Sequence, residues 1–290
     1  MHTAELPSRP VEICSASGLR LHGTYWPQST ARGVVVVAHG FGEHGGCYAH
    51  VAAALGSRAG VAVLAPDLRG HGRSPGRRGV VRTYDDLTDD LLGALDWAGQ
   101  QCPGRPRFIL GHSNGGQIAL RATLRRTDGW GPDGLILSNP LLRLSFPVPR
   151  HKVVLGRLLL CLAPGLTLPA PIEPDKLSRD PAMVPFYIAD PLRHGRMSAP
   201  LYFGMIEGGA RLLERLGAIT TRVLMIVGGN DPVVDPGTCR LAFDRLGSTD
   251  KTLLLYPHML HEPLNELGRD GVIADLVAWL DRELSSLDTR

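Results

Sequence analysis

A serine set between glycines is the residue of this chain whose surroundings point most directly to chemistry. Ser113 lies in Gly-His-Ser-Asn-Gly, residues 111–115, directly after an apolar run and before a helical pattern. A sharp strand-to-helix turn with this spacing needs glycine two positions before and after the serine, and it lifts the hydroxyl above the sheet. The next helix offers free N–H groups where negative charge would develop. We therefore expect Ser113 to be a nucleophile and the turn to exist to expose it.

A serine hydroxyl is a poor nucleophile without a base, and the base needs an acid to orient it. After this kind of turn the chain order is serine, acid, histidine. Asp231 follows an apolar strand pattern and two glycines, so it should lie at the same sheet edge as the serine. Asp235 is the alternative acid, although it also suits a helix cap. His258 and His261 both follow the last strand pattern, and spacing alone leaves the choice of base open.

The glycine-rich stretch at residues 37–46 completes the expected site. A glycine-rich loop after a buried strand lets backbone N–H groups point into a pocket, and the N–H of Phe41 could pair with that of Asn114 to hold an oxyanion. Each such donor is typically worth about 2.7–4 kcal/mol of transition-state stabilisation. The other histidines near this edge are expected to orient loops through hydrogen bonds; they are His39, His44, His71 and His112.

The elements that must position these residues alternate between strands and helices. This alternation favours a mostly parallel sheet with helices on both faces. Two segments, 11–17 and 19–27, read as a hairpin at a sheet edge. Strand patterns begin the stretches 33–40, 61–74, 107–113, 134–140, 221–234 and 251–262, and helical patterns occupy 48–60, 83–104, 115–126, 235–247 and 270–284. Thr83 is the expected cap of its helix, with Asp85 and Asp86 in the first turn.

The alternation stops after residue 140 and resumes near residue 208. The stretch between is rich in proline and holds short apolar pieces, so it reads as a mainly helical insertion. We expect a core made of residues 1–140 and 208–290, with residues 141–207 inserted as a cap.

Composition excludes several classes of protein. The 290 residues are 43% hydrophobic, which is enough for a large core. A net charge of only +3 does not suggest a nucleic-acid partner. The five cysteines form no metal or redox motif, no leader peptide or membrane span is recognisable, and a cytoplasmic protein is expected. One local cluster of arginines is expected to be a solvated loop: Arg69, Arg73, Arg77, Arg78 and Arg82.

Several stretches, taken in order, resemble α/β-hydrolases of the monoacylglycerol lipase and lysophospholipase group, which is also classed with serine aminopeptidases. They are "HGFGEH" (39–44), "DLRGHGRS" (67–74), "GHSNGG" (111–116), "LSNPLL" (137–142), "LSRDP" with "ADPL" (177–192), "GGNDPVV" (228–234) and "KTLLLYPHMLHE" (251–262). The resemblance implies an α/β-hydrolase fold with an inserted cap that covers the site, and it implies no metal or cofactor. In the family the cap carries an apolar access channel and can touch a membrane surface, a role that residues 153–168 are apolar enough to take. The alternative is that these residues pack on a core of the cap itself.

The resemblance also assigns the triad. It implies Ser113 as nucleophile and Asp231 as acid, and the family's distance from the "DKTL" segment selects His261 over His258. The pattern "HExxNE" that begins at residue 261 agrees with this choice. One departure is Asn114, which stands where the family usually has Met, so the floor of the pocket is expected to be more polar.

Three functions remain open at this point. The first is hydrolysis of a small, lipid-like carboxylic ester, such as a monoacylglycerol or a lysophospholipid. The second is a prolyl-type aminopeptidase on the same triad, which needs carboxylates in the insertion to hold an α-amino group. The third is an α/β-hydrolase that binds a ligand without catalysis. Carboxylates that could serve the aminopeptidase are Glu173, Asp175, Asp180, Asp190 and Glu207.

Overall fold

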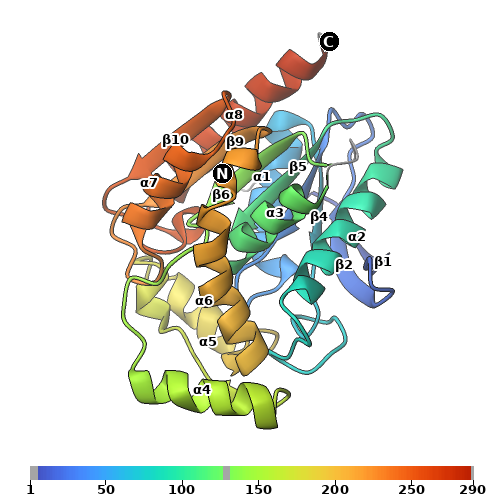
Figure 1. Cartoon of the computed structure of the whole chain (residues 1–290). Helices are drawn as coiled ribbons and strands as arrows, with labels where there is room; N and C mark the ends of the chain where they lie inside the picture. The colour runs from blue at the N-terminus through green and yellow to red at the C-terminus, as the bar shows by residue number, and fades with distance from the viewer. Residues whose placement is uncertain (1–5, 127–130, 289–290) are drawn as a thin grey trace.

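The structure is a computed structural model that describes residues 6–126 and 131–288. Within these residues a central sheet of eight strands has the order β1-β2-β4-β3-β5-β6-β9-β10 (Figure 1). The strands from β4 to β10 pair in parallel, and β1 and β2 form an antiparallel hairpin at one edge. Their bounds are β1 (Arg9–Cys14), β2 (Arg20–Trp26), β3 (Val34–Ala38), β4 (Ala62–Pro66), β5 (Arg107–His112), β6 (Gly134–Ser138), β9 (Arg222–Gly228) and β10 (Lys251–Tyr256).

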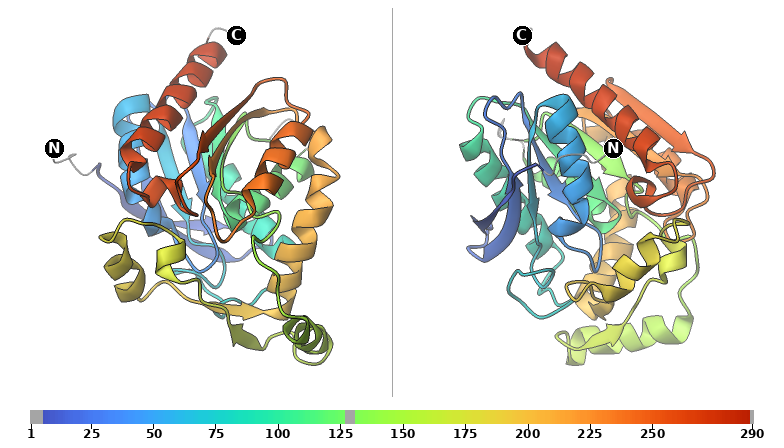
Figure 2. Two further views of the ribbon diagram at one scale, coloured as in Figure 1. Left: turned by 90° about the vertical axis from the view of Figure 1, so that its left-hand side faces the viewer. Right: turned by 180° about the vertical axis from the view of Figure 1, so that it is seen from behind.

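Helices cover both faces of the sheet, as the views in Figure 2 show. On one face lie α1 (Ala49–Ala59) and α8 (Arg269–Asp288), whose apolar side chains join one buried cluster. A second buried cluster fills the other face, under α2 (Asp85–Gln101), α3 (Asn114–Arg125), α6 (Ala199–Leu213) and α7 (Pro236–Arg245). The central strands are buried on both sides, which explains their mainly apolar sequences. The α/β fold expected from the alternation of patterns is confirmed.

The inserted segment lies beyond one end of the sheet, with α4 farthest from the core (Figures 1 and 2). It holds α4 (Arg150–Leu162), α5 (Met183–Ala189) and a small antiparallel pair, β7 (Thr167–Pro169) with β8 (Arg196–Ser198). Because α6 runs on without a break, the boundary expected at residue 207 falls inside this helix. The division into core and cap stays a prediction. Short 3-10 turns complete the description: η1 (Gly45–Tyr48), η2 (Pro174–Lys176), η3 (Leu216–Ala218) and η4 (Pro263–Asn265).

The expected cap of α2 is wrong. The Thr83 side chain does not cap this helix, whose N-cap position is Tyr84. Instead the Asp86 carboxylate accepts hydrogen bonds from the backbone N–H groups of Arg82 (2.8 Å) and Thr83 (3.2 Å). These two N–H groups precede the helix, so the Asp86 carboxylate ties the incoming chain to the first turn of α2. The N–H of Asp86 itself, which a capping hydroxyl would accept, donates to the carbonyl of Thr83 at 3.2 Å. The first-turn acids thus matter more than the sequence pattern suggested.

Candidate active site

Ser113 forms the tight turn between β5 and α3. Its backbone has φ 52° and ψ −118°, a left-handed conformation that is strained for a residue with a side chain. The flanking glycines leave the clearance that this turn needs. A Cβ at Gly115 would lie 1.9 Å from the carbonyl oxygen of Ala38, and one at Gly111 would lie 2.7 Å from the carbonyl oxygen of Gly115. The geometric reason given for the glycine spacing is therefore confirmed.

The structure brings Ser113, His261 and Asp231 into one hydrogen-bonded chain. The distance from His261 Nε2 to Ser113 Oγ is 2.9 Å, and from His261 Nδ1 to Asp231 Oδ2 it is 2.7 Å. The other carboxylate oxygen of Asp231 accepts the backbone N–H groups of Val233 (2.7 Å) and Val234 (3.0 Å). These bonds hold the Asp231 carboxylate in place beside His261, so Nδ1 of His261 carries its proton and Nε2 is free to accept one from the serine.

Burial and charge act in opposite directions on His261. Burial of the whole side chain disfavours the protonated ring, but the charge and hydrogen bond of Asp231 outweigh this effect and raise the pKa of His261 above its ordinary value. The imidazolium that would form during acyl transfer is thus stabilised in place.

The alternative base and acid lie elsewhere. His258 is exposed on the loop after β10. Asp235 is the N-cap of α7, where its side chain accepts from the N–H of Gly237 (2.9 Å). The capping role considered for Asp235 from the sequence is what the structure contains.

The two expected oxyanion donors flank the serine. Among the hydrogen bonds of the described residues, the backbone N–H groups of Phe41 and Asn114 donate to no protein atom. The sequence predicts the Asn114 side chain on the floor of the pocket, but Asn114 does not line either cavity at the serine. Its Oδ1 accepts from the buried Tyr84 hydroxyl at 2.6 Å, so the polar group that replaces the family's Met is satisfied inside the core.

Two cavities of different chemistry meet at Ser113 and Phe41. One, of about 400 Å³, is mainly apolar and extends under α4, where its lining includes Leu144, Phe146, Leu159 and Leu166. The other, of about 260 Å³, is more polar than the first, because its lining includes Glu43, His112, Asp190, Arg193 and Glu262 beside apolar residues. Because Ser113 lines both cavities, a substrate bound there would meet a different environment on each side of the bond to be cleaved.

The polar cavity contains a cluster that the sequence reading missed. Glu43 accepts from the backbone N–H of Gly40 (2.8 Å) and the Tyr48 hydroxyl (2.9 Å), and Arg193 of the inserted segment lies 3.4 Å away. Burial disfavours the charged form of Glu43, but Arg193 and neighbouring groups outweigh it, so the pKa of this carboxyl falls well below its usual value. The sequence signal for Glu43 was its place in "HGFGEH", whereas Arg193 carried no signal at all.

Glu262 faces Glu43 across this cluster. It accepts from the Tyr187 hydroxyl (2.7 Å) and from Nδ2 of Asn265 (2.6 Å). Burial and the nearby charge of Glu43 raise the pKa of Glu262 to about 7. One carboxylate therefore stays ionised beside Arg193, and the other holds its proton near neutral pH.

The donor chemistry of this region does not favour a metal. Oxygen and nitrogen atoms of Glu43, His112 and Glu262 lie within 4.8 Å of one another, but the Arg193 guanidinium already supplies the positive charge. In a second group, His44, Cys47 and Asp190, Nδ1 of His44 accepts the N–H of Gly46 and Nε2 therefore donates its proton to Asp190 (2.7 Å). The expectation that no cofactor is needed stays a prediction.

The loop histidines orient backbone as expected. Nδ1 of His39 contacts the carbonyl of Gly40 at 2.8 Å, and its Nε2 accepts the N–H of Leu68 at 3.0 Å. Nδ1 of His112 contacts the carbonyl of Ser138 at 3.1 Å. His71 contacts the carbonyl of Arg69 at 3.0 Å.

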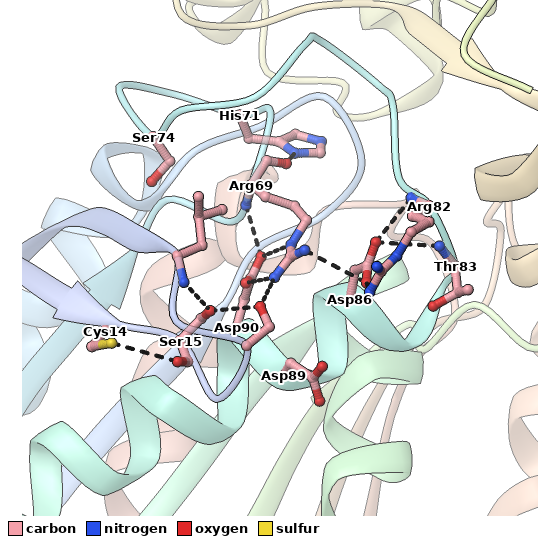
Figure 3. A network of polar contacts seen from close by, with 12 residues as sticks. Cys14, Ser15, Arg69, His71, Ser74, Arg82, Thr83, Asp86, Asp89 and Asp90 are labelled. Carbon is pink, nitrogen blue, oxygen red and sulfur yellow. Dashed lines mark hydrogen bonds and ion pairs between the residues drawn. The ribbon is translucent and has the colours of Figure 1, made fainter.

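The arginine cluster is not uniformly solvated. Figure 3 shows the Arg69 side chain directed at Asp90 and Asp86, with which it forms ion pairs. Asp90 is fully buried, and its carboxylate also accepts the backbone N–H of Arg69 at 2.9 Å. This contact anchors the loop after β4 to α2, so Arg69 is a structural residue, whereas Arg73, Arg77 and Arg82 are exposed as expected.

Comparison with known proteins agrees with this architecture. A model of the family described as serine aminopeptidase, S33 (Hydrolase_4) matches residues 29–268. The chain is 36% identical over 270 residues to a monoacylglycerol lipase of Mycolicibacterium smegmatis, covering 92% of this chain and 95% of that protein. The crystal structure of a Paleococcus ferrophilus monoacylglycerol lipase superimposes with a TM-score of 0.82 at 31% identity and covers 91% of this chain and 99% of its own.

A soluble variant of the Saccharomyces cerevisiae monoglyceride lipase, solved in complex with a substrate analogue, also has a TM-score of 0.82, at 25% identity over 96% of this chain and 95% of that one. The resemblance drawn from the sequence is thereby confirmed over most of the chain. The chain belongs to the serine aminopeptidase S33 family of α/β-hydrolases, on the branch that contains the monoacylglycerol lipases.

Proposed function

We propose that this protein hydrolyses the ester of a single-chain lipid, of the monoacylglycerol type, through Ser113, His261 and Asp231. The observation that carries the proposal is the position of the Ser113 hydroxyl. It is hydrogen-bonded to His261 and lies where an apolar cavity meets a polar one. An ester with a long acyl chain and a small polar alcohol matches that junction on both sides.

That the chain is a carboxylic ester hydrolase follows from its relatives. The monoacylglycerol lipase of Mycolicibacterium smegmatis and that of Paleococcus ferrophilus both exceed 30% identity over nine-tenths of the chain. The relative that was solved with a substrate analogue supports a lipid-like ester as substrate.

The geometry supports an acyl-enzyme mechanism. Ser113 Oγ attacks the ester carbonyl while Nε2 of His261 takes its proton, and Asp231 orients the ring and stabilises its charge. The tetrahedral oxyanion accepts the N–H groups of Phe41 and Asn114. His261 then protonates the leaving alcohol, and a water deprotonated by the same ring releases the fatty acid.

The charges of the polar cavity favour a neutral alcohol. Its acidic lining residues are Glu43, Asp190 and Glu262, against one guanidinium, that of Arg193, which already pairs with Glu43. Hydroxyl groups can donate to these acidic oxygens, whereas a phosphate would meet the like charge of the Glu43 and Asp190 carboxylates, whose pKa values are lowered. We therefore favour a glycerol headgroup over the phosphate of a lysophospholipid.

The inserted segment is proposed to touch a lipid surface. Large apolar side chains of α4 and α5 face outward, with Leu162 at 81% and Ile188 at 73% exposure. Exposed apolar side chains near a cavity that could hold a lipid chain are consistent with contact to a membrane or other lipid surface, from which the substrate would enter. No helix in the described part of the chain has the length and apolar character required to cross a membrane. A cytoplasmic location stays a prediction from the unpaired cysteines.

The aminopeptidase alternative has one observation in its favour, which is that Asp190 lines the polar cavity. Its carboxylate is already bonded to His44 at 2.7 Å. Glu173 lines the apolar cavity and pairs with Lys176, and Asp180 pairs with Arg269. An α-amino group would have to displace one of these hydrogen-bonded partners, so we rank ester hydrolysis first.

Hydrolysis assays with matched substrates test the proposal. Esters from acetyl to palmitoyl measure the acyl preference, oleoyl glycerol against oleoyl lysophosphatidylglycerol tests the headgroup, and prolyl and alanyl anilides test the aminopeptidase. We expect turnover of oleoyl glycerol to exceed the other two. Faster cleavage of an anilide would favour the peptidase, and no reaction of Ser113 with a fluorophosphonate would favour a non-catalytic binder.

Three variants assign the residues. Ser113→Ala and His261→Ala should each lower kcat by about 10⁴-fold or more, because either change removes the activated nucleophile. His258→Ala is the matched control and should keep the wild-type rate, since this side chain is exposed. Retained turnover in Ser113→Ala would overturn the proposed mechanism.

A further inference from the structure

The short segment after β6 touches the loops of all three proposed triad residues. β6 lies between β5, which leads to the serine, and β9, which leads to the acid (Figure 1). The carbonyl of Ser138 accepts the N–H of Ser113 at 2.9 Å, and the N–H of Leu141 donates to the carbonyl of Ser113 at 2.9 Å. The serine turn is thus held from both sides by residues 138–141.

The Asn139 side chain links the other two loops. Its Oδ1 accepts the N–H of Gly228, the last residue of the strand before the acid, at 2.8 Å. Its Nδ2 donates to the carbonyl of His261 at 2.8 Å and to that of Leu260 at 3.2 Å. The side chain is fully buried, so these three bonds are made without competition from solvent.

The backbone of Asn139 is strained. Among the described residues other than glycine, only Ser113 and Asn139 have a positive φ, and that of Asn139 is 41°. Such a conformation costs on the order of 1–3 kcal/mol and persists where the surroundings hold it in place. Asparagine tolerates the left-handed region better than most residues.

The base loop packs directly on the end of β9. A Cβ at Gly228 would lie 2.1 Å from the carbonyl oxygen of Leu260, and the N–H of Asn230 donates to the carbonyl of Met259 at 3.1 Å. With this close approach, a shift of either loop changes the distance between His261 and Asp231.

We propose that Asn139 is a positioning residue that sets the alignment of His261 with Asp231 and Ser113. The proposal rests on the proposed function, because it needs these three residues to act together. Two of the side-chain bonds of Asn139 go to the backbone of the base loop, and the third goes to the last residue of the strand that leads to the acid.

Asn139→Gly is the informative variant. Glycine adopts a positive φ without strain, so the fold should be retained while the three hydrogen bonds are lost. Asn139→Ala removes the same bonds and keeps the strain. Ile136→Val on the same strand is the matched control, since Ile136 is fully buried in the core cluster on the α1 and α8 side.

Steady-state kinetics on a short soluble ester, with thermal melts of each variant, give the result. We expect kcat of Asn139→Gly to fall by about 100-fold, the effect of a misplacement of roughly 1 Å, with a much smaller change in KM. The acidic limb of the pH profile should move to lower pH, because a looser contact with Asp231 lowers the pKa of His261. Ile136→Val should change neither kcat nor the profile.

The outcomes separate the proposals. A folded Asn139→Gly whose kcat and pH profile match those of the wild type would overturn the positioning role. If Ser113→Ala is inactive in the same assay, only that role fails; if Ser113→Ala is active, the proposed triad itself fails.

Discussion

Replacing Glu262 with glutamine should stabilise the protein, by an amount that grows as pH rises from 4.5 to about 7. Glu262 is buried opposite Glu43 and accepts hydrogen bonds from Tyr187 and Asn265. Glutamine has the shape of the protonated acid, so both of these bonds can be kept through its carbonyl oxygen. What the substitution removes is the ability to ionise beside Glu43.

The magnitude follows from the pKa of Glu262. Burial and Glu43 raise it from 4.5 to about 7, so the folded state holds the proton more tightly than the unfolded chain does. The stabilisation that Glu262 provides is therefore fully present below its pKa in the unfolded chain, which is 4.5, and it is lost as pH rises from 4.5 to about 7. A shift of this size is worth on the order of 3 kcal/mol. The variant and the wild type should differ little at low pH and by up to that amount above neutrality.

Urea and thermal denaturation at several pH values measure this difference. For a domain of this size 3 kcal/mol corresponds to roughly 6–12 °C in Tm. Glu12→Gln is the control, because Glu12 is exposed on β1 and pairs only with the exposed Arg20. A Glu262→Gln variant that is less stable above pH 7, or whose gain does not change with pH, would refute the reasoning and indicate that Glu262 is ionised in the folded protein.

Three further outcomes are expected. The value of kcat/KM should fall as pH drops through the raised pKa of His261, because the protonated ring cannot accept the serine proton; a rate that stays full at pH 5 would contradict this. Gly115→Ala places a Cβ 1.9 Å from the carbonyl oxygen of Ala38, so ester turnover in the folded variant should drop by about 100-fold. Arg69→Met leaves the buried carboxylate of Asp90 unpaired and should destabilise the fold by about 3–5 kcal/mol in urea denaturation, whereas unchanged stability would contradict the anchoring role.

Periodicity predicted the core well because the central strands are buried on both faces. The run Val34–Ala38 is fully buried, so every position in it requires an apolar residue and the strand is easy to recognise in the sequence. The cap of α2 was mispredicted because the N–H of Asp86 donates to the carbonyl of Thr83 and not to its hydroxyl, while the Asp86 carboxylate accepts the N–H groups of Arg82 and Thr83. Which of several nearby groups accepts an N–H at the start of a helix depends on local backbone geometry, and the sequence alone does not specify that geometry.

The candidate triad was predictable because its parts have a fixed chain order and distinct neighbours. The choice of His261 over His258 came from a family resemblance, and the structure shows its physical basis, which is burial of one ring and exposure of the other. The polar cluster was not predictable. Arg193 pairs with Glu43 across 150 positions of sequence, and it comes from an insertion whose arrangement no periodic pattern indicates.

That missed cluster changes how the inserted segment should be understood. Arg193 neutralises Glu43, and Tyr187 donates to Glu262, so two residues of the insertion satisfy carboxyl groups of the core. Without them the two acids would face each other at the entrance to the serine, with no cation between them. One acid holds the N–H of Gly40 beside the oxyanion loop, and the other directly follows the proposed base. The inserted segment therefore contributes directly to the polar side of the proposed site, through an ion pair with Glu43 and a hydrogen bond to Glu262.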